Sequence, residues 1–527
     1  MRLIDHTKLT CIFLALAVIA GVDFSIAHDG DNPGAIDGDN NWKAFELITE
    51  NDSLSGLVLG QGYTPGDSTS SGIFSWVSGI HNHWDGLGAY VVNENTLRVL
   101  VNHEGTDDAT ISGFDVNIIN LKTWATDFRT ATPWPGPGQV VTGIGNGFSQ
   151  VNVALGGSGR NITTRPLSRF CSGNVWQPNT FGPNRGFVDR LYMTGEEDLT
   201  TNNLGGSIFV LDVATEILYE APDVAPAGGR WENACIIDSG NSEQVAIVLS
   251  SDGGSEQMYL YVGTKDSSPG ANILQRNGLV GGQIFQFDPI GATTVLPLAG
   301  TLSGQFATST KEPLAEDKFE DLHTNPNSPM HVVIAEQTNG VYDIEFDLEF
   351  NPNGTLNTTN SFFHFTIIDS STDNDGVSGG NLSAPDNVVW SANGFIYVNE
   401  DGSGNDVWQL EPTNGQLVRI ADGHTTETSG VIDISTKIGF TSGSVLLTNS
   451  YDGNSINGNN GACYMLVSPI ASLLGDINLD GAINLLDVQP FVELISDGNF
   501  QAEADINQDG AVNLLDVDPF VTLLSGS

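Results

Sequence analysis

The chain has 527 residues, of which 39% are hydrophobic, so it is long enough for two or three folded units with at least one substantial core. Its 64 acidic residues outnumber 18 lysines and arginines and give a formal net charge of −46, which excludes nucleic acid as a partner because its phosphates would be repelled. The same charge attracts divalent cations. Most exposed carboxylates serve solubility, so only clustered ones are candidates for chemistry.

The first 27 residues have the features of a secretory signal peptide. Arg2 and Lys8 precede an apolar run over 12–22, and the tripeptide Ser-Ile-Ala at 25–27 has the small residues of a cleavage site. The run is too short to cross the ~30 Å apolar core of a bilayer, so we expect no membrane span there. The mature protein is therefore expected to be secreted, either extracellular or periplasmic.

Residues 28–41 are rich in Asp, Gly, Asn and Pro, which predicts a linker that does not pack. Cys11 lies within the signal peptide, so the mature protein keeps Cys171, Cys235 and Cys463. Three thiols in an exported protein cannot all pair with one another. At least one of them is therefore free, reduced or bound to a metal.

Residues 42–470 are predicted to be all-β, because their apolar segments are short and rich in β-branched residues and show no helical period. A strand that runs into an acidic or amide-rich loop recurs near residues 99–105, 192–198, 247–254, 332–340, 396–402 and 445–453. Such units are typical of propeller blades, and six of them predict a six-bladed β-propeller. One or two β-sandwiches would give similar strands, but a repeated acidic loop favours the propeller, where such loops converge on one face.

Five short motifs in this region have side chains suited to metal binding. In chain order they are Asn102-His103-Glu104, Arg169-Phe170-Cys171, Gly195-Glu196-Glu197, Trp231-Glu232 and Lys318-Phe319-Glu320. This order resembles the PhoX family of secreted alkaline phosphatases, whose six-bladed propellers carry similar elements. The resemblance covers roughly residues 80–455.

The resemblance implies a set of metal ligands: Cys171, Glu104, Glu196, Glu197, Glu232 and Glu320. Cys171 would be the thiolate ligand of a ferric pair, and Glu232 and Glu320 would be its carboxylate ligands. Glu196 and Glu197 match a calcium-associated acidic pair. Oxygen ligands suit hard cations and a thiolate suits iron, and neighbouring cations can clamp a phosphate and activate an oxygen nucleophile. Calcium and iron are thus the expected cofactors.

Lys318 would lie near the phosphate group and assist catalysis together with Glu232 and Glu320. The chain departs from the family here, because Lys318 replaces an arginine and loses its two-pronged grip on oxygen atoms. Phe319 replaces a proline, Trp231 a histidine and Gly195 a cysteine. Residues 174–190 also resemble an insertion. These departures bear on substrate preference and on whether the activity is retained.

Each of these residues also has a purely structural interpretation. Cys171 can instead form a disulfide with Cys235 or Cys463, and the two glutamates at 196–197 can belong to a solvated loop. Three functions therefore stay open: a phosphoric ester hydrolase, a non-catalytic calcium-stabilised propeller that acts as an extracellular binding or scaffold module, and a lactonase-like hydrolase that uses calcium alone. The lactonase-like function rests on the Ala-Pro-Asp-Asn motif at 384–387, which is common among propellers.

Two consecutive loops near the C-terminus have the ligand spacing of calcium sites. Oxygen-bearing side chains occupy loop positions 1, 3, 5, 9 and 12, with glycine at position 6, and these side chains are Asp476, Asn478, Asp480, Asn484, Asp487, Asp505, Asn507, Asp509, Asn513 and Asp516. Each loop leads into an apolar segment with helical spacing. The region 475–525 is therefore predicted to be a small all-α calcium-binding domain.

This duplicated loop-helix unit resembles the type I dockerin module of extracellular bacterial proteins. The resemblance implies attachment to a cohesin-like scaffold domain. Pro490 and Pro519 fall within the predicted helices and depart from the commonest pattern, so the helix lengths and the cohesin pairing depend on where these prolines lie.

Overall fold

The computed structural model describes residues 36–49, 58–59, 83–105, 109–127, 140–157, 160, 166–197, 206–226, 228–253, 258–291, 295–308, 314, 318–371, 381–401, 405–423, 427–450 and 461–525. The predicted signal peptide and the first part of the predicted linker lie outside these ranges. No helix within them is long and apolar enough to cross a membrane.

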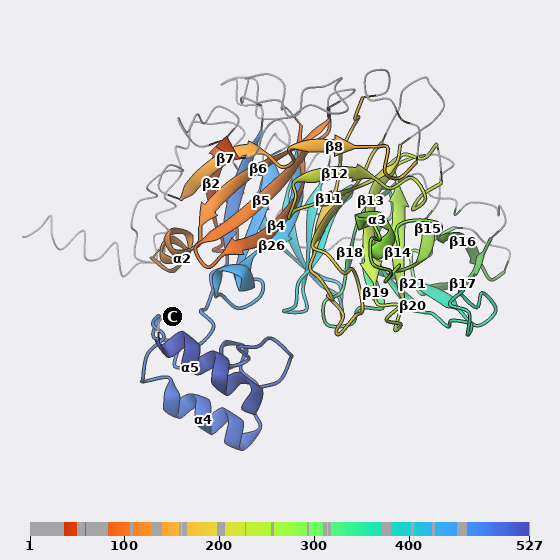
Figure 1. The fold of residues 1–527 in the computed structure, drawn as a ribbon. Coiled ribbons are helices and arrows are strands. Elements are labelled where there is room, and N and C mark those ends of the chain that lie inside the picture. Colours follow the sequence, from red (N-terminus) through yellow and green to blue (C-terminus); the bar gives the residue numbers. More distant parts are fainter. Residues whose placement is uncertain are drawn as a thin grey trace, which may run out of the picture.

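Residues 36–467 form a six-bladed β-propeller (Figure 1). The first strands of the blades are β4 (Trp84–Asn93), β9 (Gly173–Trp176), β13 (Trp231–Ile237), β18 (Phe319–Thr324), β22 (Pro385–Trp390) and β26 (Thr428–Asp433). Each contacts the next in this order, and β26 contacts β4, so the ring is closed. The predicted propeller is therefore confirmed.

The remaining strands extend each blade outward by antiparallel pairing. They are β5 (Thr96–His103), β6 (Thr110–Asn117) and β7 (Val141–Asn146); β10 (Leu191–Gly195), β11 (Ile208–Asp212) and β12 (Ile217–Glu220); β14 (Gln244–Ser251), β15 (Tyr259–Thr264), β16 (Gln283–Pro289) and β17 (Thr301–Ala307); β19 (His331–Glu336), β20 (Gly340–Asp347) and β21 (Phe362–Ser370); β23 (Ile396–Glu400), β24 (Val407–Glu411) and β25 (Gln416–Asp422); and β27 (Val445–Ser450) and β28 (Ala462–Val467). The third and fourth blades join at their rims, where β17 pairs with β21.

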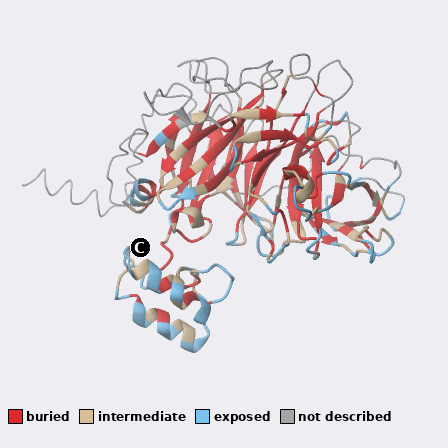
Figure 2. Ribbon diagram, viewed as in Figure 1, coloured by how far each residue is buried: buried red, intermediate tan, exposed pale blue. Residues whose placement is uncertain are grey.

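The blades are held together by apolar side chains between neighbouring sheets. Figure 2 shows that most residues of the propeller strands are buried. Because each sheet is covered on both faces, its inner strands do not alternate between apolar and polar residues. All residues of β14 and β27 are buried. This explains why the sequence shows short continuous apolar runs instead of a period of two.

Short segments from elsewhere in the chain complete four of the blades. β2 (Lys43–Thr49) pairs with β28 in the sixth blade and β1 (Asp37–Gly38) pairs with β25 in the fifth, while β3 (Val58–Leu59) and β8 (Gln150–Asn152) pair in parallel with β7 and β12. The expectation that residues 28–41 do not pack is wrong for 36–41. Ile36 is buried, and Asp39 accepts a hydrogen bond from Arg419 at 2.8 Å.

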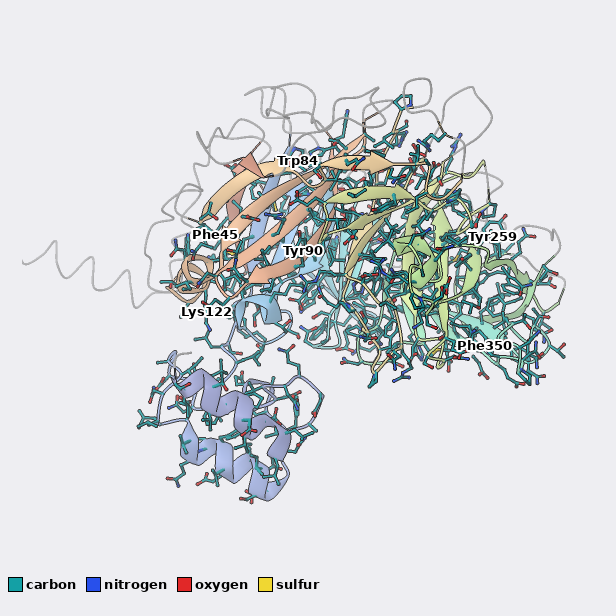
Figure 3. All side chains as sticks on the ribbon, in the orientation of Figure 1. Phe45, Trp84, Tyr90, Lys122, Tyr259 and Phe350 are labelled. Carbon is teal, nitrogen blue, oxygen red and sulfur yellow. The ribbon has the colours of Figure 1, made fainter. Side chains whose placement is uncertain are left out.

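Helices are few and lie outside the sheets. α2 (Ile118–Asp127) and the 3-10 helix η3 (Ser435–Ile438) lie at the end of the propeller that faces the C-terminal unit, and α3 (Ile273–Arg276) connects β15 to β16. In Figure 3, Trp84 at the start of β4 lies near the upper end of the propeller, and Lys122 of α2 lies at its lower end. The upper end therefore collects the starts of the first strands.

The C-terminal unit consists of two calcium-type loops and the helices α4 (Val488–Asp497) and α5 (Val517–Ser525), with short 3-10 helices η4 (Ala502–Ala504) and η5 (Leu514–Asp516). The rings of Phe491 and Phe520 pack with centroids 4.3 Å apart. Pro490 and Pro519 each occupy the third residue of a helix, where the missing N–H has no helical partner. The prolines therefore do not shorten the helices, as the predicted all-α domain requires.

Candidate metal centre

The first strands of five blades begin in the same way, with a β-bulge after the first or second residue. The bulge lies between Trp84 and Leu87 in β4 and recurs at the start of β13, β18, β22 and β26. A bulge redirects the side chains that it contains. The second residues of these strands are Asp85, Glu232, Glu320, Asp386 and Ser429, all of them buried at one end of the ring.

The second strands contribute the acidic loops that the sequence repeats. Glu104 follows β5, Glu197 follows β10 and Asp252 follows β14, and Cys171 precedes β9. The acidic side chains and the thiol form three overlapping groups in which ligand atoms lie within 4.8 Å of one another: Asp85, Glu104 and Cys171; Cys171, Glu197 and Glu232; and Glu232, Glu320 and Asp386. We call these six carboxylates and Cys171 the carboxylate cluster.

Burial is the main reason why Glu320 and Asp386 of the carboxylate cluster have raised pKa values. It raises the pKa of Glu320 well above its ordinary value, and the nearby Glu232 raises it further. Asp386 shows the same direction, again with burial first and Glu320 next. A bound cation would relieve this repulsion and compensate for the lost hydration. The carboxylate cluster thus has the electrostatics of a cation site.

Cys171 is a free, buried thiol. Cys235 and Cys463 are also free and buried, so the alternative of a disulfide is wrong for this structure. Burial raises the pKa of Cys171 well above its usual range, and Glu104 and Glu197 add to the effect. The thiolate would thus form only with a cation beside it, which lowers the pKa of a coordinating thiol.

One buried oxygen of the carboxylate cluster lacks a hydrogen-bond donor. Glu197 Oε2 lies 2.9 Å from Arg169 Nη2, whereas Oε1 accepts no hydrogen bond within the described part of the chain. An unsatisfied buried carboxylate oxygen is unfavourable unless a cation or another donor completes it. Together with the hard oxygen donors and one sulfur, it fits a site for calcium and a thiolate-ligated transition metal.

Two basic side chains flank the carboxylate cluster. The Arg169 side chain contacts both Glu104 and Glu197 through its Nη2. Its main chain also bonds both loops: the Arg169 N–H donates to the Gly105 carbonyl at 2.8 Å, and the Arg169 carbonyl accepts from the Glu197 N–H at 3.1 Å. Lys318 Nζ lies 2.9 Å from Glu320 and 3.5 Å from Asp252. Burial opposes the charge on Lys318, but these carboxylates raise its pKa overall, so it is a cation.

Glu196 does not belong to the carboxylate cluster. Its carboxylate pairs with Arg160, at 2.7 Å from Nη1 to Oε1, and accepts the Ser168 N–H at 3.1 Å. Arg160 also binds Glu220 at 3.0 Å. The prediction that Glu196 and Glu197 act as one metal-binding pair therefore disagrees with this geometry, because consecutive side chains of an extended segment point in opposite directions.

Hydrogen bonds between blades hold the carboxylate cluster in place. Ser172 Oγ donates to Glu232 Oε1 at 2.5 Å and accepts from Asn387 Nδ2 at 2.9 Å. Asn387 Oδ1 accepts the Gly430 N–H at 2.6 Å, and Ser429 Oγ donates to Asp85 at 2.5 Å. The five blades that carry these residues are therefore connected directly through the centre, which fixes the cluster's side chains.

A second connection lies one residue further along the bulges. Asn233 Nδ2 donates to Asp321, and Asp321 accepts the Val388 N–H at 3.1 Å and the Leu322 N–H at 2.7 Å. Burial raises the pKa of Asp321 to about 7, although these donors lower it. Asp321 is therefore a structural acceptor and not a member of the carboxylate cluster.

Sequence reasoning missed Asp85, Asp252, Asp386 and Arg169 as site residues. The sequence did contain a signal for Asp85 and Asp386. The Trp-Asp pair at 84–85 and the Pro-Asp-Asn motif at 385–387 have the same arrangement as two motifs that the prediction used, Trp231-Glu232-Asn233 and Phe319-Glu320-Asp321. In each case a large or cyclic residue precedes an acid at the start of a first strand. Nothing comparable marks Arg169, whose contacts depend on two distant loops.

The two C-terminal loops have matching internal geometry. Asp476 accepts N–H groups of Asp480 at 3.0 Å and Gly481 at 2.8 Å, and Asp505 accepts those of Asp509 at 3.1 Å and Gly510 at 3.0 Å. Position 12 of each loop is a fully buried aspartate that accepts several N–H groups: Asp487 and Asp516. Gly481 and Gly510 have φ of 86° and 85°. Both loops thus adopt the sharp turn that the ligand spacing requires.

Residues 474–519 match the model of the dockerin type I domain family. The C-terminal unit is a type I dockerin. Comparison with curated proteins found no match for the chain.

Among solved structures, Pseudomonas fluorescens PhoX in complex with vanadate, a transition state analogue, is 11% identical to this chain with a TM-score of 0.51. The match covers 83% of this chain and 96% of the PhoX chain. A Penicillium chrysogenum alpha-L-arabinanase with arabinobiose is 10% identical, covers 74% and 96%, and has a TM-score of 0.39.

The likeness to PhoX therefore shows the fold, which is a PhoX-like propeller followed by a dockerin. At 11% identity it does not show the chemistry of the carboxylate cluster. That chemistry has to be argued from the residues.

Proposed function

We propose that the chain is an exported, metal-dependent phosphoric ester hydrolase of the alkaline phosphatase type, with calcium and iron at the carboxylate cluster. The observation that carries the proposal is the convergence of Cys171 with Glu197 and Glu232, continued through Glu320 and Asp386. Such a mixed thiol and carboxylate set has no use in a calcium-only lactonase or in a passive scaffold. When bound, the cations would clamp phosphate oxygens and activate an oxygen nucleophile.

The residues of the chain would divide the remaining work among them. Arg169 holds Glu104 and Glu197 together on one side, and Lys318 does the same for Glu320 and Asp252 on the other. The Lys318 side chain is 34% exposed, so its ammonium can also meet a phosphate oxygen as a point charge. Glu232 and Glu320 would serve as ligands, and the hydrogen bond from Ser172 would orient Glu232.

Secretion and attachment complete the proposal. The predicted N-terminal signal peptide supports export, and the dockerin supports attachment to a cohesin-like scaffold domain. The two loops would bind calcium through their ten side-chain ligands. Leu485 and Leu486 of the first loop and Leu514 and Leu515 of the second are exposed at equivalent positions, which supports a docking face there.

The decisive experiment measures phosphomonoester hydrolysis at alkaline pH by the wild type, Glu320→Gln, Lys318→Ala and Lys318→Arg, each with folding and metal content checked. Glu320→Gln should lose activity by at least about a hundredfold, because removing a ligand costs several kcal/mol of transition-state stabilisation. Lys318→Ala should weaken turnover, and Lys318→Arg should preserve or raise it, since a guanidinium can bind two oxygens.

Two outcomes would end the proposal. One is a metal-replete wild type that hydrolyses no phosphate ester, and the other is a Glu320→Gln variant as active as the wild type. Either result would favour the non-catalytic binding module, in which the Lys318 contacts with Glu320 and Asp252 are only structural.

A further inference from the structure

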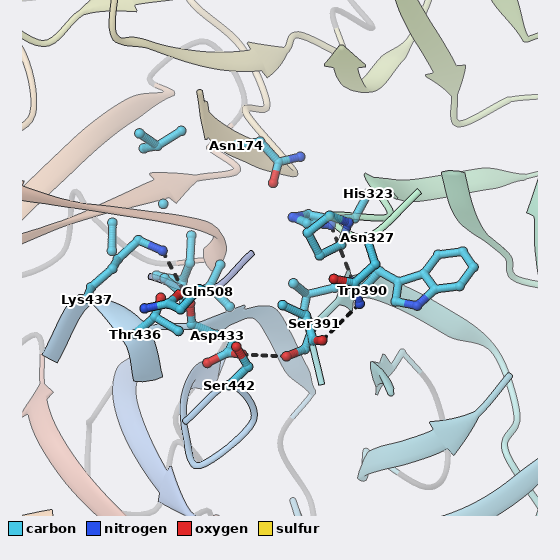
Figure 4. Close-up of a pocket in the computed structure, with 18 residues that line it drawn as sticks. Asn174, His323, Asn327, Trp390, Ser391, Asp433, Thr436, Lys437, Ser442 and Gln508 are labelled. Atoms are coloured by element: carbon cyan, nitrogen blue, oxygen red, sulfur yellow. Dashed lines mark hydrogen bonds between the residues drawn. The ribbon is translucent and has the colours of Figure 1, made fainter. Parts of the chain in front are cut away.

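A polar cavity of about 330 Å³ lies in the central channel of the propeller, at the end opposite to the carboxylate cluster (Figure 4). Its walls come from the later residues of the first strands, such as Ala89 of β4 and Trp390 of β22, whereas the carboxylate cluster uses the second residues. None of the cavity's lining residues belongs to the carboxylate cluster. The cavity needs its own explanation.

Lys437 is the cation in this cavity. Arg98, Arg160, Arg185, Arg276 and Arg419 all pair with carboxylates. Lys437 forms no ion pair within the described ranges, and its one hydrogen bond there goes to the Asp433 main-chain oxygen at 3.4 Å. Lys122 and Lys265 likewise form no ion pair within the described ranges, but of these three lysines only Lys437 lines this cavity.

The nearby Asp433 carboxylate does not form an ion pair with Lys437, because both of its oxygens already accept hydrogen bonds from other groups. One oxygen accepts from the Ser435 N–H at 2.9 Å and its hydroxyl at 2.5 Å, and the other from Ser391 Oγ at 2.5 Å and the Gly443 N–H at 2.8 Å. Burial lowers the pKa of Lys437. The ammonium therefore keeps hydrogen-bond donors available on the side of the cavity.

His323 lies across the cavity from Lys437 in Figure 4. Its Nδ1 accepts the Trp390 N–H at 3.4 Å, so in the neutral ring Nε2 carries the proton and is a donor. Burial lowers the pKa of His323 to about 4, which keeps the ring neutral at pH 7. Thr436 and Ser442 add hydroxyl groups to the wall. The Lys437 ammonium and the His323 ring thus present donors to this space, and the Asp433 carboxylate in its wall is already bonded to other groups.

We propose that this cavity binds a small oxyanion, held by the Lys437 ammonium and the His323 Nε2–H. Its volume accommodates an ion of the size of sulfate or phosphate with several waters, since a water occupies ~30 Å³. Gln508 of the second dockerin loop also lines the cavity, so the dockerin borders its opening. The site is separate from the proposed hydrolase centre and does not depend on it.

Calorimetric titration of the full, calcium-loaded chain with sodium sulfate at constant ionic strength tests the proposal. The wild type should bind one sulfate, and Lys437→Met should raise the Kd by about tenfold or more, because a charge-assisted hydrogen bond is lost. Lys122→Met is the matched control. Lys122 is also half-buried with a pKa lowered by burial. It lines a neighbouring cavity that Lys437 also borders, but it does not line the proposed oxyanion site, so the variant should bind sulfate as the wild type does.

Three results would overturn the proposal: no sulfate binding by the wild type, unchanged binding by Lys437→Met, or equal losses in Lys437→Met and Lys122→Met. If Lys437→Met does not fold, His323→Asn replaces it, since asparagine can still accept the Trp390 N–H but lacks a donor at the Nε2 position. This variant should also weaken sulfate binding about tenfold, and unchanged binding would contradict the proposal.

Discussion

At the scale of single residues, the proposed metal centre depends on which side chains a bulge or a loop turns inward. Cys171 is the one sulfur donor in the carboxylate cluster. Cys171→Ser should therefore lose iron while it keeps calcium in the dockerin, because a serine hydroxyl is a poor substitute for a thiolate on iron. Metal analysis of the purified variant measures this directly.

Cys235→Ser is the control for that experiment. Cys235 is equally buried, but it lies within the third blade and belongs to none of the three groups. The Cys235→Ser variant should keep its iron, even if it is less stable than the wild type. Iron retained in Cys171→Ser, or lost equally from both variants, would exclude Cys171 as a ligand.

His323 should make the propeller sensitive to acid. Its pKa is about 4 in the folded protein, below the ordinary 6.5, so between these values the unfolded chain takes up a proton that the folded chain does not. Stability from this group is present above pH 6.5 and is lost as the pH falls towards 4. His323→Asn removes this contribution, which amounts to about 2–3 kcal/mol between pH 7 and pH 4.5.

Urea unfolding of the two proteins at both pH values measures the effect. The variant can be less stable at pH 7 because the ring stacks on Trp176, with centroids 6.4 Å apart, but it should lose less stability on acidification. If the unfolding free energies of the wild type and His323→Asn change equally with pH, the lowered pKa of His323 would be contradicted.

At the scale of secondary-structure elements, the starts of the first strands carry most of the carboxylate cluster. Gly86 lies within the β4 bulge and donates its N–H to the Cys171 carbonyl at 3.1 Å. A Cβ at this position would lie 2.5 Å from that carbonyl oxygen, so Gly86→Ala must displace the segment that carries Cys171. We expect a loss of about 1–3 kcal/mol in unfolding free energy, together with lower iron content.

Gly147→Ala separates these two effects. Its Cβ would meet the Ile111 side chain at 2.8 Å instead of the main chain of a residue in the carboxylate cluster. It should lower stability without lowering iron content in the folded fraction. Normal iron content in Gly86→Ala would show that the bulge does not position Cys171.

At the scale of the whole molecule, calcium should control the dockerin but not the closure of the ring. The two loops place ten ligand side chains in a small volume, and six of these are aspartates, which repel one another without a cation. Removing calcium should expose residues 475–525 to hydrogen exchange and to proteases. The inter-blade core should stay protected, because apolar contacts hold it together.

Hydrogen exchange of the full chain in calcium and in chelator measures both regions at once. Return of protection on adding calcium, but not magnesium, is the expected control, since magnesium demands tighter octahedral geometry. Equal protection of the dockerin with and without calcium would show that its fold does not depend on the ion.

The sequence alone determined the features that are local in the chain. The dockerin loops carry all their ligands within twelve residues, and the blades repeat a strand and an acidic loop, so spacing and periodicity were enough to predict both. The candidates Glu104, Glu197, Glu232 and Glu320 come from the resemblance of short local motifs to the PhoX family.

Only the tertiary structure decided which of those side chains meet. Ser429 and Asp85 are 344 positions apart yet share a hydrogen bond, and the ring closes through strands from both ends of the propeller. The same arrangement turns Glu196 towards Arg160 and brings Asp386 to Glu320. These contacts depend on how the blades pack around the axis and on where each bulge falls, which sequence periodicity does not specify.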